Sequence, residues 1–480
     1  MEALEIKFVK FRKELYESLD KRADATMDLI DAISGNQSAS SPVQLSLSSL
    51  FRRQYASLHD AVDNFSMTGN TQSKHTEQQQ KLTHVTASLI SKPVKRNFYL
   101  LATDATSQPR QFAKTLSDRG FVYRPNPIKG NKPVTIGHSY SALVGCPEKE
   151  GDMAPPWVVP VSLLRIPTDE KATDIAASQI DALLGDTDLP FSETLSVVVG
   201  DTAYSAVTFL SQVAEHDNLV AVVRVRGDRI FYRKPMTAGT QKGKGHPTWF
   251  GEKFVLGDDK TYGTPDETVS ETFATRGGKV CNVTIMAWRN LMMRGKKNIP
   301  MHKHPFTVLR ITTEDAEGNM VYRKPMWLII FGERRNEISV KDAYDAYRQR
   351  FDIEHFFRFG KNRLLIDSYQ TPETEHEENW WAIVALAYVQ LFAASGIAMP
   401  GCHPWERYLP NFKRDSGIPT PSMVQRDMPR IISEFGTPAK APKLRGKSPG
   451  RLKGDCPGRR ERFPVIKKGD QSHKNASPGP

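Results

Sequence analysis

The sequence predicts an α/β protein built on a central β-sheet, with acidic residues at the ends of two of its strands. The runs NFYLLATD, ending at Asp104, and LSVVVGD, ending at Asp201, are apolar enough for strands that are buried on both faces. Further strand-like runs and stretches of helical periodicity lie between and after them. An acidic residue at the end of a central strand points into the crevice where open sheets bind ligands.

The predicted core elements are three strands, a helix, a strand, a helix and a strand. They are the strand ending at Asp104, strands over 134–145 and 157–167, a helix over 173–185, the strand ending at Asp201, the helix AVTFLSQVAEH and a strand over 218–226. The second and third strands alternate in polarity and have Gly or Pro near their ends, which favours antiparallel neighbours. The first helix has amphipathic spacing and ends at Gly185.

The most specific pattern is the frame Tyr347-x2-Arg350-x3-Glu354-x6-Lys361, in AYRQRFDIEHFFRFGKNRL. A helix would place these four side chains on one narrow stripe. One carboxylate beside two cations and a phenol suits a phosphate-bearing ligand with a metal ion. The alternative is a solvated helix face with an ordinary i,i+4 pair between Arg350 and Glu354. The phenylalanines around the stripe favour a helix packed on a sheet, with the charges at a cleft.

With this frame the chain resembles the DDE transposases of bacterial insertion sequences, in the branch that carries a Tyr-Arg-Glu-Lys signature of the same spacing. The resemblance implies a ribonuclease-H-like catalytic core in which Asp104, Asp201 and Glu354 are the catalytic and metal-binding acids. It implies two divalent cations, Mg²⁺ with Mn²⁺ able to substitute, about 3.5 to 4 Å apart. Either aspartate alone is better explained as a strand-end cap or turn residue. The three acids together favour the catalytic interpretation.

The resemblance also implies a function, that of a metal-dependent DNA endonuclease and strand transferase. Such an enzyme cuts at insertion-sequence ends and joins the 3′-hydroxyl to target DNA. Tyr347, Arg350 and Lys361 would bind phosphates, and Trp327 would stack on a base extruded from the transposon end. A core tryptophan is the alternative at position 327. A nuclease of the same fold without strand joining, and a non-catalytic DNA-binding derivative, also stay open. The expected partners are double-stranded DNA and a second copy of the chain in the DNA complex.

The chain divides into five predicted segments. These are a helical N-terminal module (1–90), the catalytic core (94–226 with 341–400), a β-rich insertion (227–340), loops with a short helix (401–436) and a disordered basic tail (437–480). The insertion is predicted because the step from Asp201 to Glu354 is far longer than one connection needs. The N-terminal module either recognises DNA ends, with residues 51–55 facing DNA, or serves for packing or dimerisation.

Composition limits the alternatives. The 480 residues carry a net charge of +12, and 437–480 hold twelve Lys or Arg against three acids. A basic, Pro- and Gly-rich tail adds salt-dependent affinity for DNA of any sequence, unless it is an idle extension. No apolar run approaches the ~20 residues of a membrane span, and the start lacks a secretory signal, so we expect a soluble, cytoplasmic, nucleoid-associated protein. The four cysteines are too scattered for a zinc finger or a disulfide framework.

Overall fold

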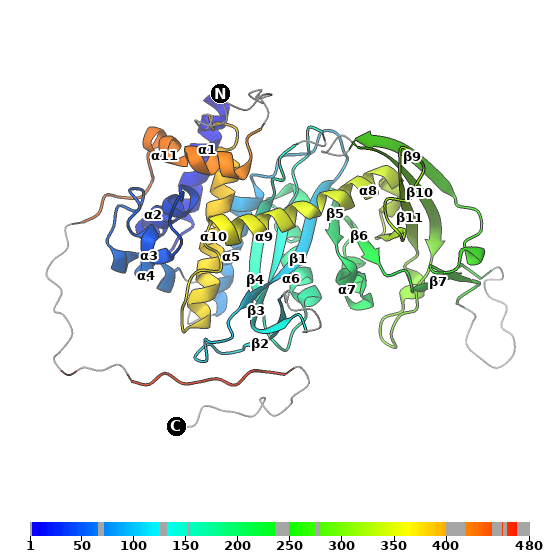
Figure 1. The fold of residues 1–480 in the computed structure, drawn as a ribbon, viewed down its shortest axis with the longest axis horizontal. Coiled ribbons are helices and arrows are strands. Elements are labelled where there is room, and N and C mark those ends of the chain that lie inside the picture. The colour runs from blue at the N-terminus through cyan, green and yellow to red at the C-terminus, as the bar shows by residue number, and fades with distance from the viewer. Residues whose placement is uncertain are drawn as a thin grey trace.

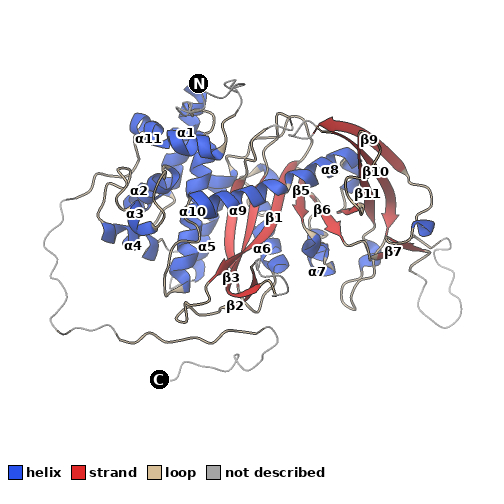
Figure 2. Ribbon diagram, in the orientation of Figure 1, coloured by secondary structure: helices blue, strands red, loops and turns tan. Residues whose placement is uncertain are grey.

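The computed structural model describes residues 2–65, 72–124, 132–151, 154–235, 249–274, 279–399, 418–443, 454 and 458–467. Figure 1 shows a twisted sheet that runs from the middle of the molecule to the right, with helices gathered at the left and a long helical rod in front of the sheet. Figure 2 shows the same division between helices and strands. The protein is α/β, as the sequence predicts.

The strands of the central sheet are parallel in the middle and antiparallel outside it. They are β1 (Tyr99–Pro109), β2 (Gly120–Tyr123), β3 (Val134–Gly145), β4 (Val159–Ile166), β5 (Ser196–Gly200), β6 (Leu219–Val225), β9 (Glu267–Ala274), β10 (Val280–Leu291), β11 (Phe306–Asp315) and β12 (Met326–Phe331). Among the described residues their order is β2-β3-β1-β5-β6-β12-β11-β10-β9, and β4 also pairs with β3. Only β1, β5 and β6 pair in parallel. The antiparallel β4-β3-β1 group beside two parallel strands fits a ribonuclease-H-like core.

Helices cover the sheet and build the left side of the molecule. They are α1 (Glu2–Glu17), α2 (Ala23–Ser34), α3 (Pro42–Leu45), α4 (Tyr55–Asp63), α5 (Gln72–Ala87), α6 (Ala172–Leu184), α7 (Val207–Val213), α8 (Val340–Gln349), α9 (Phe351–Arg363), α10 (Thr374–Ala394) and α11 (Pro421–Phe435). A small sheet pairs β7 (Ile230–Tyr232) with β8 (Lys253–Val255). The predicted strands and helices of the core lie near the expected positions, except that β1 continues past Asp104, where the sequence predicts its end, to Pro109. The strand β2 was not predicted. Within the described residues, no helix is both long and apolar enough to cross a membrane.

The N-terminal helices share one hydrophobic core with the central sheet, through the long helix α10. A buried polar network fixes this junction. Arg12 of α1 donates to Asp31 of α2 at 2.6 Å, and Gln390 of α10 donates to the same carboxylate at 2.9 Å. Arg52 and Arg53 both pair with the buried Asp28. These two arginines therefore hold the helices together, which weakens the case for residues 51–55 as a surface for DNA.

The β-rich insertion (227–340) extends the central sheet instead of standing beside it. β12 pairs with β6, with Trp327 opposite Val225 and Phe331 opposite Ala221. β11, β10 and β9 follow as further antiparallel strands. This arrangement gives partners to the main-chain groups that an unpaired β6 edge would expose.

The structure describes parts of the basic tail, for which the sequence predicts disorder over 437–480, and two of these parts contact the folded core. Arg52 donates to the carbonyl of Ala439 at 3.0 Å, and Arg53 to that of Lys440 at 2.6 Å. Residues 458–467 form main-chain hydrogen bonds with the loop that follows β1. Residues 444–453, 455–457 and 468–480 lie outside the described residues, as do 401–417 of the predicted loop segment.

A buried carboxylate joins α10 to the sheet. Glu377 is fully buried and accepts hydrogen bonds from Arg110, His138 and Tyr140. Burial alone would raise the pKa of Glu377, but the hydrogen bond from His138 and the attraction of His138 and Arg110 hold it below its usual range.

We predict that Glu377→Gln lowers the free energy of unfolding by about 3–5 kcal/mol at pH 7, because it leaves the Arg110 guanidinium buried without its anion. The folded-state pKa of Glu377 is depressed, so this stabilisation is present above the unfolded value of about 4.3 and is lost as pH falls through the folded value. Urea denaturation at pH 7 and at lower pH measures both effects. The exposed Glu375→Gln on the same helix is the control, and an equal loss in both variants would contradict the prediction.

Candidate active site

Two of the predicted acids project from matched positions on neighbouring strands. In the parallel pair of β1 and β5, Ala102 lies opposite Val199. Asp104 and Asp201 each follow two residues later, so they reach the same edge of the sheet at the same level. Neighbouring strands lie about 4.8 Å apart, which brings the two carboxylates close together.

The turn after β5 is shaped to present Asp201. Its carboxylate accepts the amide of Ala203 at 2.8 Å and caps a short 3₁₀ turn, Thr202–Ser205. Gly200 precedes it, and a Cβ there would lie 2.8 Å from the ring of Tyr204. Since such contacts do not occur between real side chains, only glycine lets the chain turn at this point. Asp201 is therefore a turn residue, the alternative that the sequence left open, and it is also a side chain of the candidate site.

The third acid arrives on two helices that meet at Arg350. The sequence predicts one helix through the whole frame, but α8 ends and α9 begins at this residue, with i to i+3 hydrogen bonds on both sides of it. The two helices form the bent rod in front of the sheet in Figure 1. Arg350 donates to Asp104 at 3.2 Å and to Glu354 at 2.9 Å. Its side chain is 8% exposed, and its guanidinium holds two of the three carboxylates.

Burial and charge together perturb Asp104. Burial raises the pKa of Asp104 to about 6, against the lowering effects of the Arg350 charge and the Ala105 amide. The carboxylates of Asp201 and Glu354 add to the increase. The three acids therefore act on one another electrostatically, and their mutual repulsion favours a cation between them.

The other two members of the frame take different positions. Tyr347 is buried, and its ring centroid lies 5.7 Å from the guanidinium of Arg350. Burial raises the pKa of Tyr347, while Arg350 and Arg224 act to lower it. Lys361 lies farther along the rod and donates to Thr106 and to the carbonyl of Ser107, at 2.9 and 3.0 Å. Lys361 therefore ties α9 to β1 beyond Asp104.

The donor chemistry of the site fits a hard divalent cation, because all three acids supply carboxylate oxygens. Two of these carboxylates are nevertheless already bonded to the Arg350 guanidinium. In the part of the chain that the structure describes, no three His, Cys, Asp or Glu side chains converge as metal ligands. Arg350 bonds both Asp104 and Glu354. Metal binding by all three acids requires this arginine to release them.

Trp327 is buried, with 3% of its surface exposed. It belongs to an aromatic cluster in the insertion, where Tyr262, Trp288 and Phe254 lie 5.4, 6.2 and 6.4 Å away between ring centroids. This position agrees with the core tryptophan considered as the alternative. Stacking on an extruded base would require the cluster to open.

A group of arginines that was not predicted lies beside Asp201. A cavity of about 720 Å³ is lined by Asp201 and its turn together with Arg226, Asp228 and Arg229. Arg224, which lies on β6 two residues before Arg226, is exposed. The run VRVRGDR at the end of a central strand is the feature from which these residues were recognisable, since β6 ends at the same edge as β5.

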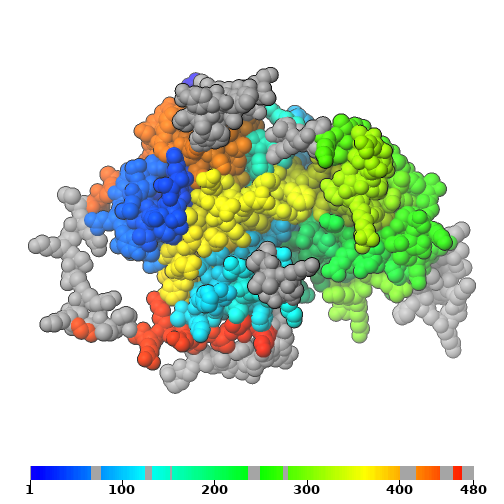
Figure 3. Space-filling view, viewed as in Figure 1, coloured from blue at the N-terminus to red at the C-terminus, as the bar shows by residue number. Residues whose placement is uncertain are grey.

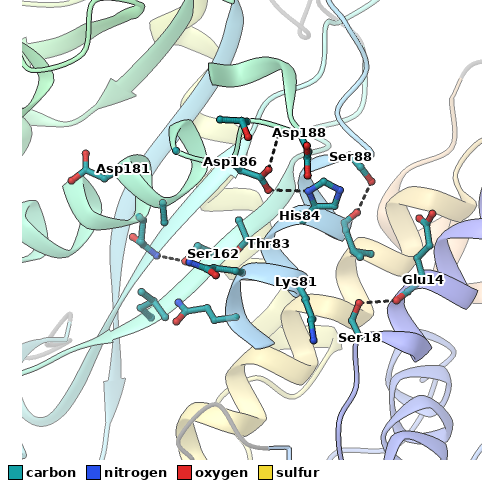
Figure 4. Close-up of a pocket in the computed structure, with 18 of the residues that line it drawn as sticks. Glu14, Ser18, Lys81, Thr83, His84, Ser88, Ser162, Asp181, Asp186 and Asp188 are labelled. Carbon is teal, nitrogen blue, oxygen red and sulfur yellow. Dashed lines mark hydrogen bonds and ion pairs between the residues drawn. The ribbon is translucent and has the colours of Figure 1, made fainter. Parts of the chain in front are cut away.

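Another cavity lies away from these residues. It has a volume of about 1070 Å³ and is lined by residues of α1, α5, β4 and α6. Figure 4 shows His84 pointing toward Asp186, to which it lies at 2.9 Å, with Lys81 and Glu14 nearby. None of the candidate site residues lines this cavity.

The comparison with known proteins agrees with this geometry. The family described as DDE superfamily endonuclease matches residues 14–294, more than half of the chain. The chain belongs to this family. A DDE superfamily endonuclease acts on DNA and generally uses divalent metal ions, so the chain is a nuclease-type enzyme and DNA is its substrate class. The match contains Asp104 and Asp201 and ends before Tyr347. No curated protein matches the sequence.

We predict that Asp104 and Arg350 are energetically coupled in this endonuclease. Arg350→Gln lowers the free energy of unfolding at pH 7, and the loss is smaller when Asp104 is already Asn, with a coupling energy of about 1–3 kcal/mol. Urea denaturation of the two single variants and the double variant, in the presence of a chelator, gives this energy. The exposed pair Lys341 and Asp345 is the matched control and should couple by less than about 0.5 kcal/mol. Equal coupling in both pairs would contradict the prediction.

We also predict that Trp327→Ala lowers the free energy of unfolding by about 3–5 kcal/mol, because it empties the centre of the aromatic cluster. Tyr322→Ala, an exposed aromatic residue before the same strand, should change it by no more than about 0.5 kcal/mol. Thermal and urea denaturation measure both variants. A Trp327→Ala protein as stable as the parent would exclude the core-packing role.

Proposed function

We propose that this endonuclease is a DNA transposase, which cuts at insertion-sequence ends and joins the freed 3′-hydroxyl to target DNA. The observation that carries the proposal is that Arg350 bonds both Asp104 and Glu354, while the charge of Asp201 acts on Asp104 from the neighbouring strand. The spacing of Tyr347, Arg350, Glu354 and Lys361 supports the same assignment.

The three carboxylates would hold two divalent cations, Mg²⁺ or Mn²⁺, which when bound stabilise charge on the attacking and leaving oxygens of the phosphodiester. Arg350 has a task linked to this binding. Once it releases Asp104 and Glu354, its planar guanidinium presents two N–H groups to a DNA phosphate. Arg350 thus holds the acids in place before DNA arrives and binds the substrate afterwards.

Other cations of the site would position the DNA strand. Lys361 is anchored on β1, so an approaching phosphate would exchange for its contacts with Thr106 and Ser107. Arg226 and Arg229 line the cavity beside Asp201 and suit phosphates on the far side of the scissile bond. The ring of Tyr347 lies against the Arg350 guanidinium and orients it. In these roles the cations fix the phosphorus near the acids, which is the main requirement of phosphoryl transfer.

A nuclease without strand joining is the second candidate, and the family description as an endonuclease fits it equally well. Both candidates hydrolyse a phosphodiester to leave a 3′-hydroxyl. Only a transposase then uses that hydroxyl as the nucleophile on a second duplex. Supplying a pre-cleaved end with a free 3′-hydroxyl and a plasmid target separates the two, since joined product forms only with the transposase.

We predict that Asp104→Asn, Asp201→Asn and Glu354→Gln each reduce Mg²⁺-dependent nicking of an end-containing duplex by at least about 10³-fold, because each removes one ligand charge at nearly constant volume. DNA binding in a gel-shift assay should stay within a few-fold of the parent. Asp186→Asn, which changes an acid of the other cavity, is the control and should nick normally. Normal nicking by any one of the three variants would remove that residue from the triad.

Base stacking by Trp327 is testable in the same assay. If Trp327 leaves its cluster to stack on an extruded base, an abasic site at that position should partly restore cleavage by Trp327→Phe, because unstacking costs less there. The same lesion should not rescue Arg350→Ala, which loses a phosphate contact. Failure of every lesion near the end to rescue Trp327→Phe would leave only the packing role.

A further inference from the structure

The segment 458–467 is bound to the catalytic domain although it lies far along the basic tail. The amide of Phe463 donates to the carbonyl of Lys114 at 2.9 Å, and the amide of Ile466 donates to that of Arg119 at 2.8 Å. The Arg119 side chain returns a hydrogen bond to the carbonyl of Phe463 at 3.1 Å. Figure 3 shows the segment, in red, along the lower side of the molecule beneath the cyan surface.

Both main-chain and side-chain contacts hold the segment on the loop. Arg119 is buried and also donates to the carbonyls of Leu116 and Arg110, both at 3.2 Å, so the same guanidinium shapes the loop and holds the segment. Phe463, Val465 and Ile466 are partly buried. Near its start, Arg460 pairs with Glu373 at 2.6 Å.

Docking leaves a row of cations exposed. Arg459, Arg462 and Lys467 are exposed, and among the described residues none of them has a carboxylate partner. Glu461 is the one acid of the segment. A segment held by its main chain therefore displays three positive charges on the folded core, instead of carrying them on a free chain.

The loop that holds this row follows the strand that carries Asp104. β1 continues past Asp104 to Pro109, and the loop that binds the segment begins at the next residue. Six residues of strand span about 20 Å, so the docking loop starts about that far beyond Asp104. This is less than one helical turn of DNA, about 34 Å. A duplex with its scissile phosphate at the acids can thus have other phosphates at the row.

We infer that 458–467 is a docked cationic segment that binds the phosphates of DNA held in the candidate active site, an inference that rests on the proposed action on DNA. The partner is the duplex backbone, without preference for sequence. The inference assigns Arg459, Arg462 and Lys467 to DNA contact, and Phe463, Ile466 and Arg119 to fixing their position.

The test separates charge from position in the full-length protein. Arg459→Gln/Arg462→Gln/Lys467→Gln removes the cations and keeps the docking contacts. Phe463→Pro/Ile466→Pro removes the two amide donors and keeps every charge. Lys7→Gln/Lys10→Gln/Lys13→Gln removes the same charge from α1, which lies at the top of Figure 1, away from the segment. Affinity for a random-sequence duplex is measured by fluorescence anisotropy over a range of salt, without divalent metal.

The charge variant should bind about tenfold more weakly, with a slope of log K against log salt that is shallower by about 2–3, since each lost phosphate contact removes about 0.9. The proline variant should lose a comparable factor, although its net charge is unchanged. The α1 variant should bind as the parent does. Hydrogen exchange over 458–467 should be slow in the parent and fast in the proline variant.

Three outcomes would overturn the inference. Parent-like binding by the proline variant would mean that the tail acts as a free polycation. Parent-like binding by the charge variant would mean that the segment does not touch DNA. Equal weakening of the α1 variant would reduce the effect to net charge. Absence of DNA binding by the parent itself would instead refute the proposed function, so the two failures are distinguishable.

Discussion

The parallel pairing of β1, β5 and β6 is the constraint on which the active site depends. The residues of β5 are all buried, so their main-chain groups need partners on both sides and the register has little freedom. That register brings Asp104 and Asp201, about a hundred positions apart in the chain, to the same level of one edge. Once this pairing is formed, it determines the positions of the Asp104 and Asp201 side chains relative to each other.

Charge balance then determines how the third acid joins the first two. Three carboxylates at a partly buried edge repel one another, and the raised pKa of Asp104, about 6, reflects that cost together with burial. Arg350 offsets it by bonding two of the acids at once. In the proposed function, the cation that stabilises these two acids is also the group that would bind the substrate phosphate.

The extensions of the core act on the same edge. The insertion continues the sheet through β12, so the C-terminal end of β6 and its arginines stay beside Asp201. On the other side, the loop after β1 is held from within by the buried pair of Arg110 and Glu377 and carries the 458–467 segment on its outer surface. Positive charge therefore flanks the three acids from both directions along the sheet.

The sequence by itself predicted most strands and helices of the core and named the residues of the candidate site. Burial on both faces is visible in a run such as LSVVVGD, and the spacing of the Tyr347 frame fixes its side chains because helical geometry is local. The break of the rod at Arg350 was not predictable, since it depends on how two helices meet the curved sheet. Only the tertiary structure decided that Trp327 is enclosed by aromatic residues from other strands, and that 458–467 finds hydrogen-bond acceptors on a loop more than three hundred residues earlier. Such outcomes depend on contacts between distant segments. A basic, proline-rich run has no periodic pattern from which these contacts could be predicted.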